Sequence, residues 1–196
     1  MAQLNPQQQQ AIRYLDGPLL VLAGAGSGKT SVITHKIAHL LEQGYSPHEI
    51  VAVTFTNKAA REMKQRVAQL LAGRDCKGLS ISTFHLLGLR MLREHAPLCG
   101  YRANFSIFDA DDALQLVREL MRKTLSADNG AADRVYAQIS QWKNALVDPA
   151  AALARGDSDP IAAAAARVYG EYRQNLLAYN ACDFEDVIAQ PVALLR

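Results

Sequence analysis

The chain has 196 residues, of which 49% are hydrophobic and 20% charged, with a formal net charge of +2. This balance is typical of a globular protein and excludes a disordered chain. No apolar run approaches the ~20 residues of a membrane-spanning helix, and the polar N-terminus does not resemble a signal peptide. Three cysteines without C-x-x-C spacing favour neither a disulfide framework nor a zinc site. We therefore expect a cytoplasmic protein with no membrane partner, built as one domain or as one domain with an insertion.

Positive charge is concentrated in the first part of the chain. Residues 1–88 carry nine Lys and Arg against five Asp and Glu, and residues 89–181 carry eleven of each. Residues 182–196 carry one basic and three acidic side chains. A basic bias of this size is compatible with a phosphate-bearing partner, although charge alone favours a solvated surface without a specific role.

Strand-like and helix-like patterns alternate over the first 95 residues. Short apolar runs at Leu19–Ala23, Ile50–Thr54 and Leu79–Ser82 are typical of buried parallel strands. A helical pattern follows each run, over residues 29–43, 58–71 and 85–95. Three β-α units in succession predict a parallel sheet with right-handed crossovers.

After Pro97 the pattern becomes helical. Asp109 is a predicted N-cap, and a further helix is expected over residues 131–146. Asp159 precedes a proline, the combination that opens a helix, and the alanine-rich helix after it should end near residue 179. Asp183 can cap a last helix, which a proline at position 191 would kink. The prediction is an α/β unit followed by a helical unit.

A glycine-rich segment lies between the first predicted strand and its helix. It consists of Ala23, Gly24, Ala25, Gly26, Ser27, Gly28, Lys29 and Thr30. Glycines let backbone N–H groups turn inward around an anion, and the following helix N-terminus adds its dipole. The pattern is that of a P-loop, with Ala23 in place of the first glycine. It predicts that Lys29 reaches the β- and γ-phosphates of a nucleotide and that the Thr30 hydroxyl binds Mg²⁺.

The P-loop alone leaves the reaction open. A GTPase would carry N-K-x-D to bind guanine, and Asn57-Lys58-Ala59-Ala60 lacks the aspartate. A small-molecule kinase would carry several arginines in a lid. Arg118, Arg122 and Arg134 instead follow helical patterns that favour solvated faces.

Four further segments share one family pattern. They are Leu4-Asn5-Pro6-Gln7-Gln8-Gln9-Gln10-Ala11, Val53-Thr54-Phe55-Thr56-Asn57-Lys58-Ala59-Ala60, Ser82-Thr83-Phe84-His85 and Asp183-Phe184-Glu185-Asp186. In this order they resemble the Q motif, motif Ia, motif Ib and D-F-x-D element of the UvrD/Rep/PcrA-type superfamily 1 DNA helicases. In that family alanine is normal at the first P-loop position. Residues 103–109 are most similar to the Rep branch.

The resemblance implies a RecA-like motor domain that is incomplete within this sequence. Residues 1–88 would be its first part, residues 89–181 an inserted all-helical domain that contacts duplex DNA, and residues 182–196 the segment that returns to the motor domain. It also implies an ATP-dependent helicase or translocase of 3′-to-5′ polarity, acting in DNA replication or repair. ATP and Mg²⁺ would be its cofactors. Single-stranded DNA and its junctions with duplex would be its partners.

The resemblance also assigns roles to single residues. The Gln8 amide would recognise adenine, and Lys29 and Thr30 would act in ATP hydrolysis. Phe55 would stack on a DNA base, with Thr56 and Asn57 bonding the DNA backbone. The DNA track would continue over Thr83, Phe84 and His85, with His85 on a phosphate or sugar. From the residues alone, a polar N-terminal run and a structural histidine are the favoured explanations of Gln8 and His85. A core position explains Phe55 as well as base stacking does.

Two departures from the family pattern limit the expected activity. Ser31 follows Thr30 where relatives often carry an arginine that stacks over adenine, so base binding should be weaker. The Walker B Asp-Glu pair, the arginine fingers and the partner motor domain would come from the remaining C-terminal part of the helicase. The chain can therefore be part of an ATP-driven translocase or a nucleotide- and DNA-binding module without turnover. A small-molecule kinase is the third alternative, and motif Ia and Thr83-Phe84-His85 argue against it.

Overall fold

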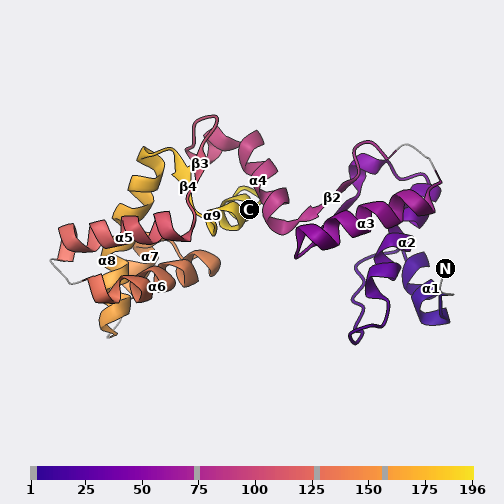
Figure 1. The fold of residues 1–196 in the computed structure, drawn as a ribbon, viewed down its shortest axis with the longest axis horizontal. Coiled ribbons are helices and arrows are strands. Elements are labelled where there is room, and N and C mark those ends of the chain that lie inside the picture. The colour runs from indigo at the N-terminus through magenta and orange to yellow at the C-terminus, as the bar shows by residue number, and fades with distance from the viewer. Residues whose placement is uncertain (1–3, 73–75, 126–128, 156–158) are drawn as a thin grey trace. The chain divides into compact units, whose positions relative to one another are not determined.

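The computed structural model describes residues 4–72, 76–125, 129–155 and 159–196. The chain divides into two compact units, residues 1–84 and 85–196 (Figure 1). Each unit contains one pair of parallel strands, and most of the described residues lie in helices. Over these residues, no helix combines the length and the apolar character that crossing a membrane requires.

The first unit places helices against a two-stranded parallel sheet. Its elements are α1 (Pro6–Arg13), α2 (Lys29–Glu42), the 3₁₀ turn η1 (Pro47–Glu49), β1 (Val51–Thr54), α3 (Asn57–Leu70) and β2 (Ser80–Thr83). β1 and β2 pair in parallel, so that Thr54 lies opposite Thr83 at their carboxyl ends. Ile37, Val67 and Ile81 belong to the core shared by α2, α3 and the strands. Two of the three predicted β-α units are therefore confirmed.

The predicted first strand is wrong for the structure as described. Leu19–Ala23 adopts no strand, and Leu20 and Leu22 are 80% and 86% exposed. An apolar strand becomes buried only when neighbouring strands bond its edges and other layers cover its faces. The two strands described in this unit, β1 and β2, pair with each other and not with this segment. The apolar run is therefore suited to burial, but no strand among the described residues pairs with it.

The second unit is a helical bundle with a short strand pair at one side. Its elements are α4 (Phe84–Glu94, which starts at the last residue of the first unit), η2 (Ala96–Cys99), β3 (Ser106–Ile107), α5 (Ala110–Leu125), η3 (Asn129–Ala131), α6 (Ala132–Asn144), α7 (Pro149–Ala154), α8 (Pro160–Ala178), β4 (Ala181–Cys182) and α9 (Asp186–Leu194). Helices α5, α6 and α8 pack against one another (Figure 1). Val117, Ile139 and Tyr172 are fully buried between them, and Trp142 joins the same core.

Two predicted helix caps are confirmed. The Asp109 carboxylate accepts hydrogen bonds from the backbone N–H groups of Asp111 and Asp112, each at 2.9 Å. The Asp159 carboxylate accepts from the N–H groups of Ile161 and Ala162. Each cap satisfies first-turn donors that the helix leaves unpaired and stabilises its helix by about 0.5–2 kcal/mol.

The segment after α8 is held inside the second unit from two sides. β4 pairs in parallel with β3, with Ala181 opposite Ser106. Pro191 lies inside α9 and has no N–H to donate to the carbonyl of Val187 four residues earlier. Gly88 of α4 comes against that carbonyl so closely that a Cβ on residue 88 would lie 2.1 Å from the Val187 oxygen. The glycine thus allows α4 to pack directly on the first turn of α9.

Candidate nucleotide and nucleic-acid site

The glycine-rich loop forms an open cradle ahead of α2. Gly26 and Gly28 have φ angles of +74° and +82°, in the left-handed region that other residues rarely adopt. The Ser27 hydroxyl donates to the Gly24 carbonyl at 2.7 Å and braces the turn. Because Gly28 has no side chain to cap α2, the N–H groups of the first helical turn stay open to an anion. The loop can therefore bind phosphate.

Lys29 and Thr30 lie at the start of α2, where the sequence places them. The Lys29 ammonium donates to the carbonyl oxygens of Ala23 at 2.8 Å and Gly24 at 2.6 Å. It is therefore folded over the loop mouth, and a bound phosphate would take up these donors. Thr30 is exposed and can supply one oxygen to Mg²⁺. Among the described residues no group of three or more His, Cys, Asp or Glu could hold a metal ion.

Gln8 is tied directly to the phosphate loop. It lies in the first turn of α1, where its Oε1 accepts from the Asn5 N–H at 2.9 Å in a reciprocal capping box. Its Nε2 donates to the Ser27 carbonyl at 3.0 Å. One amide hydrogen and one lone pair remain, the combination that matches the N7 and N6 groups of adenine. The polar N-terminal run thus has a definite place beside the loop.

Lys36 of α2 binds the carboxyl end of α1, the helix that carries Gln8. Its ammonium donates to the carbonyls of Ala11 and Tyr14, at 3.0 and 2.5 Å, at the carboxyl end of α1. A cation at this end also interacts favourably with the helix dipole. This role of Lys36 could not be predicted from the sequence, because a lysine in an amphipathic helix carries no signal of its partner.

Two aromatic rings follow the ends of the paired strands. Phe55 comes directly after β1 and is 90% exposed, which excludes its interpretation as a core residue. Phe84 follows β2 and is half exposed, and the two ring centroids lie 6.0 Å apart with a tilt of 47°. Exposed rings at the carboxyl edge of parallel strands can stack on nucleic-acid bases.

The polar residues beside these rings have different surroundings. The Thr56 hydroxyl accepts from the Ala59 N–H at 3.1 Å and caps α3. Asn57 is exposed at the first position of that helix, whereas Thr83 is buried in β2. Of the three, Asn57 has the clearest access to a ligand.

His85 belongs to the second unit. Its ring stacks on that of Phe184, with centroids 4.1 Å apart and planes inclined by 25°. Phe184 is the second residue of the D-F-x-D element and is itself 56% exposed. Within the second unit, the structure thus brings His85 together with Phe184 of the separately predicted D-F-x-D element.

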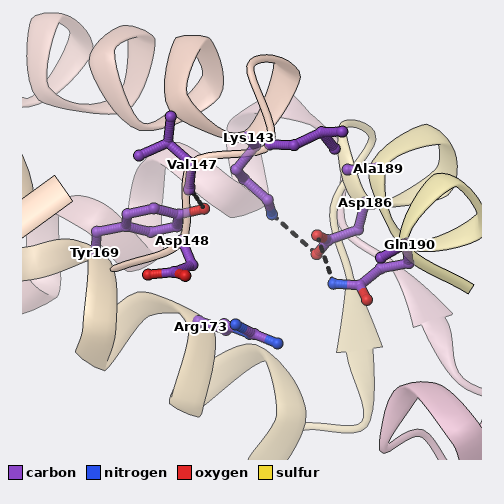
Figure 2. Close-up of a pocket in the computed structure, with 10 residues that line it drawn as sticks. Lys143, Val147, Asp148, Tyr169, Arg173, Asp186, Ala189 and Gln190 are labelled. Atoms are coloured by element: carbon purple, nitrogen blue, oxygen red, sulfur yellow. Dashed lines mark hydrogen bonds and ion pairs between the residues drawn. The ribbon is translucent and has the colours of Figure 1, made fainter. Parts of the chain in front are cut away.

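A buried ionic cluster was not predicted from the sequence. The Lys143 ammonium lies 2.5 Å from Asp183 Oδ2 and 2.9 Å from Asp186 Oδ2. The Tyr172 hydroxyl donates to the same Asp183 oxygen at 2.8 Å. Figure 2 shows Lys143 extending toward the Asp186 carboxylate, with Gln190 on the other side of that carboxylate. One signal could have revealed the cluster: Lys143 follows Ile139 by four residues, on the apolar face of α6.

Burial and neighbouring charges of opposite sign shift the pKa values of Lys143 and Asp186 in opposite directions. Burial lowers the pKa of Lys143, but the carboxylates of Asp186 and Asp183 outweigh it, so the net shift of that pKa is upward. Burial raises the pKa of Asp186 despite the adjacent ammonium. Burial and the Asp183 charge raise the pKa of the Tyr172 hydroxyl, which therefore remains a hydrogen-bond donor. Lys143 thus neutralises part of a charge that the fold has removed from water.

Comparison with known proteins agrees with this arrangement of motifs. Residues 4–196 match the UvrD/REP helicase N-terminal domain. The chain is 50% identical to ATP-dependent DNA helicase Rep of Escherichia coli K12, over 98% of this chain and 29% of that protein. It is 47% identical to ATP-dependent DNA helicase UvrD1 of Mycobacterium tuberculosis H37Rv, over 98% of this chain and 26% of the relative. The chain thus spans less than a third of the length of these relatives. It belongs to the UvrD/REP helicase N-terminal domain family.

Proposed function

We propose that this chain binds ATP with Mg²⁺ and single-stranded DNA as the N-terminal part of a DNA helicase or translocase. The hydrogen bond between Gln8 Nε2 and the Ser27 carbonyl carries the nucleotide part of the proposal. It joins an adenine-matching amide to a phosphate-binding loop within one unit. The exposed rings of Phe55 and Phe84 carry the DNA part. Residues 1–88 would be the first part of the motor domain, 89–181 the inserted helical domain, and 182–196 the return segment.

The nucleotide site is tested by removing the Lys29 ammonium. Lys29→Ala should weaken ATP binding by about 1.5–3 kcal/mol, the range for a charge-assisted hydrogen bond. Titration with a fluorescent ATP analogue measures this loss, and Lys36→Met offers a matched control on the same helix. Because Lys36 holds α1 rather than phosphate, its variant should retain binding of inorganic pyrophosphate while Lys29→Ala loses it. Equal titration curves for wild type and Lys29→Ala would remove the assignment.

The DNA site is tested by removing the Phe55 ring. Phe55→Ala should weaken binding of oligothymidylate by about 1–3 kcal/mol if a base stacks there. Tyr45→Ala is the matched control, because Tyr45 is another exposed aromatic residue of the first unit. Neutralising about 2–3 phosphates should also give a log–log salt slope of about −1.4 to −2.1 on a single strand. An affinity independent of salt, or no effect of Phe55→Ala, would refute the site.

The exposed apolar run at residues 19–22 indicates a partner within the parent helicase. Leu20 and Leu22 are the kind of side chains that a parallel sheet buries, and the relatives are more than three times as long as this chain. The remaining C-terminal part would supply the neighbouring strands and cover this run. Hydrogen exchange should then be fast at residues 19–23 in this chain and slow in a longer chain that includes the C-terminal part. Equally fast exchange in both chains would argue against this partner.

A further inference from the structure

We propose that Lys143 is a positioning residue, which fixes the Asp183–Asp186 turn and thereby holds the Phe184 ring against His85. The proposal goes beyond the family motifs, because Lys143 lies on α6 and outside all of them. It rests on the proposed function in one respect, namely that His85 is a DNA contact. The stack itself is a feature of the second unit and can be measured without DNA.

Five contacts fix the turn from inside the protein. Asp183 is fully buried, and its Oδ2 receives both the Lys143 ammonium and the Tyr172 hydroxyl. Its other oxygen accepts from the Asp186 backbone N–H at 2.9 Å. The Asp186 carboxylate is held by Lys143 at 2.9 Å and by Gln190 at 3.4 Å. Both aspartates of the turn are therefore anchored through one ammonium.

Phe184 projects outward between these two anchored acids. It is 56% exposed although Asp183 before it is fully buried, so the turn itself determines where the ring points. His85 lies on α4, which packs on α9 where Gly88 meets the Val187 carbonyl. The two rings thus come from different elements, Phe184 from the turn and His85 from α4. They stack with their centroids 4.1 Å apart. A shift of the turn would separate the rings even with both helices intact.

General energetics favour positioning over stability as the purpose of this cluster. A buried ion pair contributes little net stability, because desolvating the charges offsets most of their attraction. Hydrophobic residues of similar volume in place of all three charged side chains would fill the core at little cost in stability, whereas removal of Lys143 alone leaves both carboxylates unpaired. Only a cation with several donors can hold two carboxylates at once and so define the path of the turn.

The stack is measured by the NMR signals of the His85 ring, which the Phe184 ring current shifts. Phe184→Leu gives the signals of an unstacked His85. We expect Lys143→Met and the charge-matched Lys143→Met/Asp186→Asn to move the signals most of the way to those values. Arg173→Met is the control. Arg173 is an exposed cation that lines a cavity of about 140 Å³ together with Lys143 and Asp186 (Figure 2). It forms no ion pair among the described residues. Arg173→Met should leave the His85 signals as in wild type.

Trp142 fluorescence reports in each variant whether the second unit is folded, because this single tryptophan lies in its core. Wild-type His85 signals in a folded Lys143 variant would overturn the proposal. Loss of the native Trp142 emission in both Lys143 variants would overturn it as well, because Lys143 would then support the whole unit rather than the stack.

A DNA arm separates this inference from the proposed function. Lys143→Met should weaken oligothymidylate binding about two- to tenfold, the value of one hydrogen bond, and no more than His85→Ala does. A variant that combines Lys143→Met with His85→Ala should bind oligothymidylate no more weakly than His85→Ala alone. If the His85 signals move while DNA affinity stays constant, the positioning role stands and the assignment of His85 as a DNA contact fails.

Discussion

Replacing Lys143 by methionine is expected to lower the free energy of unfolding of the second unit by about 3–5 kcal/mol. The substitution leaves the buried carboxylates of Asp183 and Asp186 without their cation, and the low local dielectric makes unpaired charge costly. A unit in the middle of the usual stability range, about 10 kcal/mol, remains folded after such a loss. Urea unfolding at pH 7, followed by Trp142 fluorescence, measures the change.

The pH dependence gives this prediction a second test. Because the pKa of Lys143 is raised in the fold from 10.5, the folded state keeps its proton where the unfolded chain loses it. This contribution to stability is fully present below pH 10.5 and is lost as pH rises through the folded value. The gap between wild type and Lys143→Met should therefore narrow at alkaline pH. Arg173→Met should stay within about 0.5 kcal/mol of wild type, and an equal effect of both substitutions would contradict the assignment.

Hydrolysis of ATP by this chain alone is expected to stay near background, even with single-stranded DNA present. Phosphoryl transfer depends on positioning and on charge stabilisation, and an arginine finger alone contributes about 10³–10⁵ in rate. The loop supplies Lys29 and Thr30, and the family pattern places the carboxylates that complete the metal site in the C-terminal part of the helicase. Asp183 and Asp186 are both paired with Lys143. Binding can persist without turnover, because the cradle needs only the loop, α1 and α2.

Phosphate release with saturating oligonucleotide and Mg²⁺ tests this expectation. Lys29→Ala serves as the matched control for a contaminating ATPase, since it removes the phosphate ligand from this site alone. Turnover above about 1 s⁻¹, the low end of ordinary enzymes, that disappears in Lys29→Ala would show that the chain contains the complete catalytic set. To act as the catalytic carboxylates, Asp183 and Asp186 would then have to leave their ion pairs with Lys143.

Features encoded by neighbouring residues could be predicted from the sequence. The P-loop pattern, the caps at Asp109 and Asp159 and most helix bounds depend on local spacing. The structure confirms the two caps and most helix bounds, and the P-loop stays a prediction. The strand at Leu19–Ala23 could not be judged in this way, because burial of a parallel strand depends on neighbours elsewhere in a sheet. Hydropathy indicates only that the segment is suited to burial.

Features that depend on distant partners were missed for the same reason. Lys143 and Asp183 are 40 residues apart and meet only because α8 and the β3–β4 pair bring the chain back. Gln8 gained its interpretation from a family pattern, and its bond to Ser27 spans 19 residues. A single sequence carries no record of such pairs.

The central claim is that separate places on this chain bind nucleotide and single-stranded DNA, and a crossed titration tests it most directly. A fluorescent ATP analogue and a fluorescent oligothymidylate are each titrated, in the absence of the other, into wild type, Lys29→Ala and Phe55→Ala. We expect Lys29→Ala to lose about 10- to 150-fold in ATP affinity, corresponding to about 1.5–3 kcal/mol, and to keep its DNA affinity. Phe55→Ala should show the reverse pattern. The claim is contradicted if either substitution weakens the binding of ATP and of DNA equally. It is also contradicted if Lys29→Ala leaves ATP binding unchanged and Phe55→Ala leaves DNA binding unchanged.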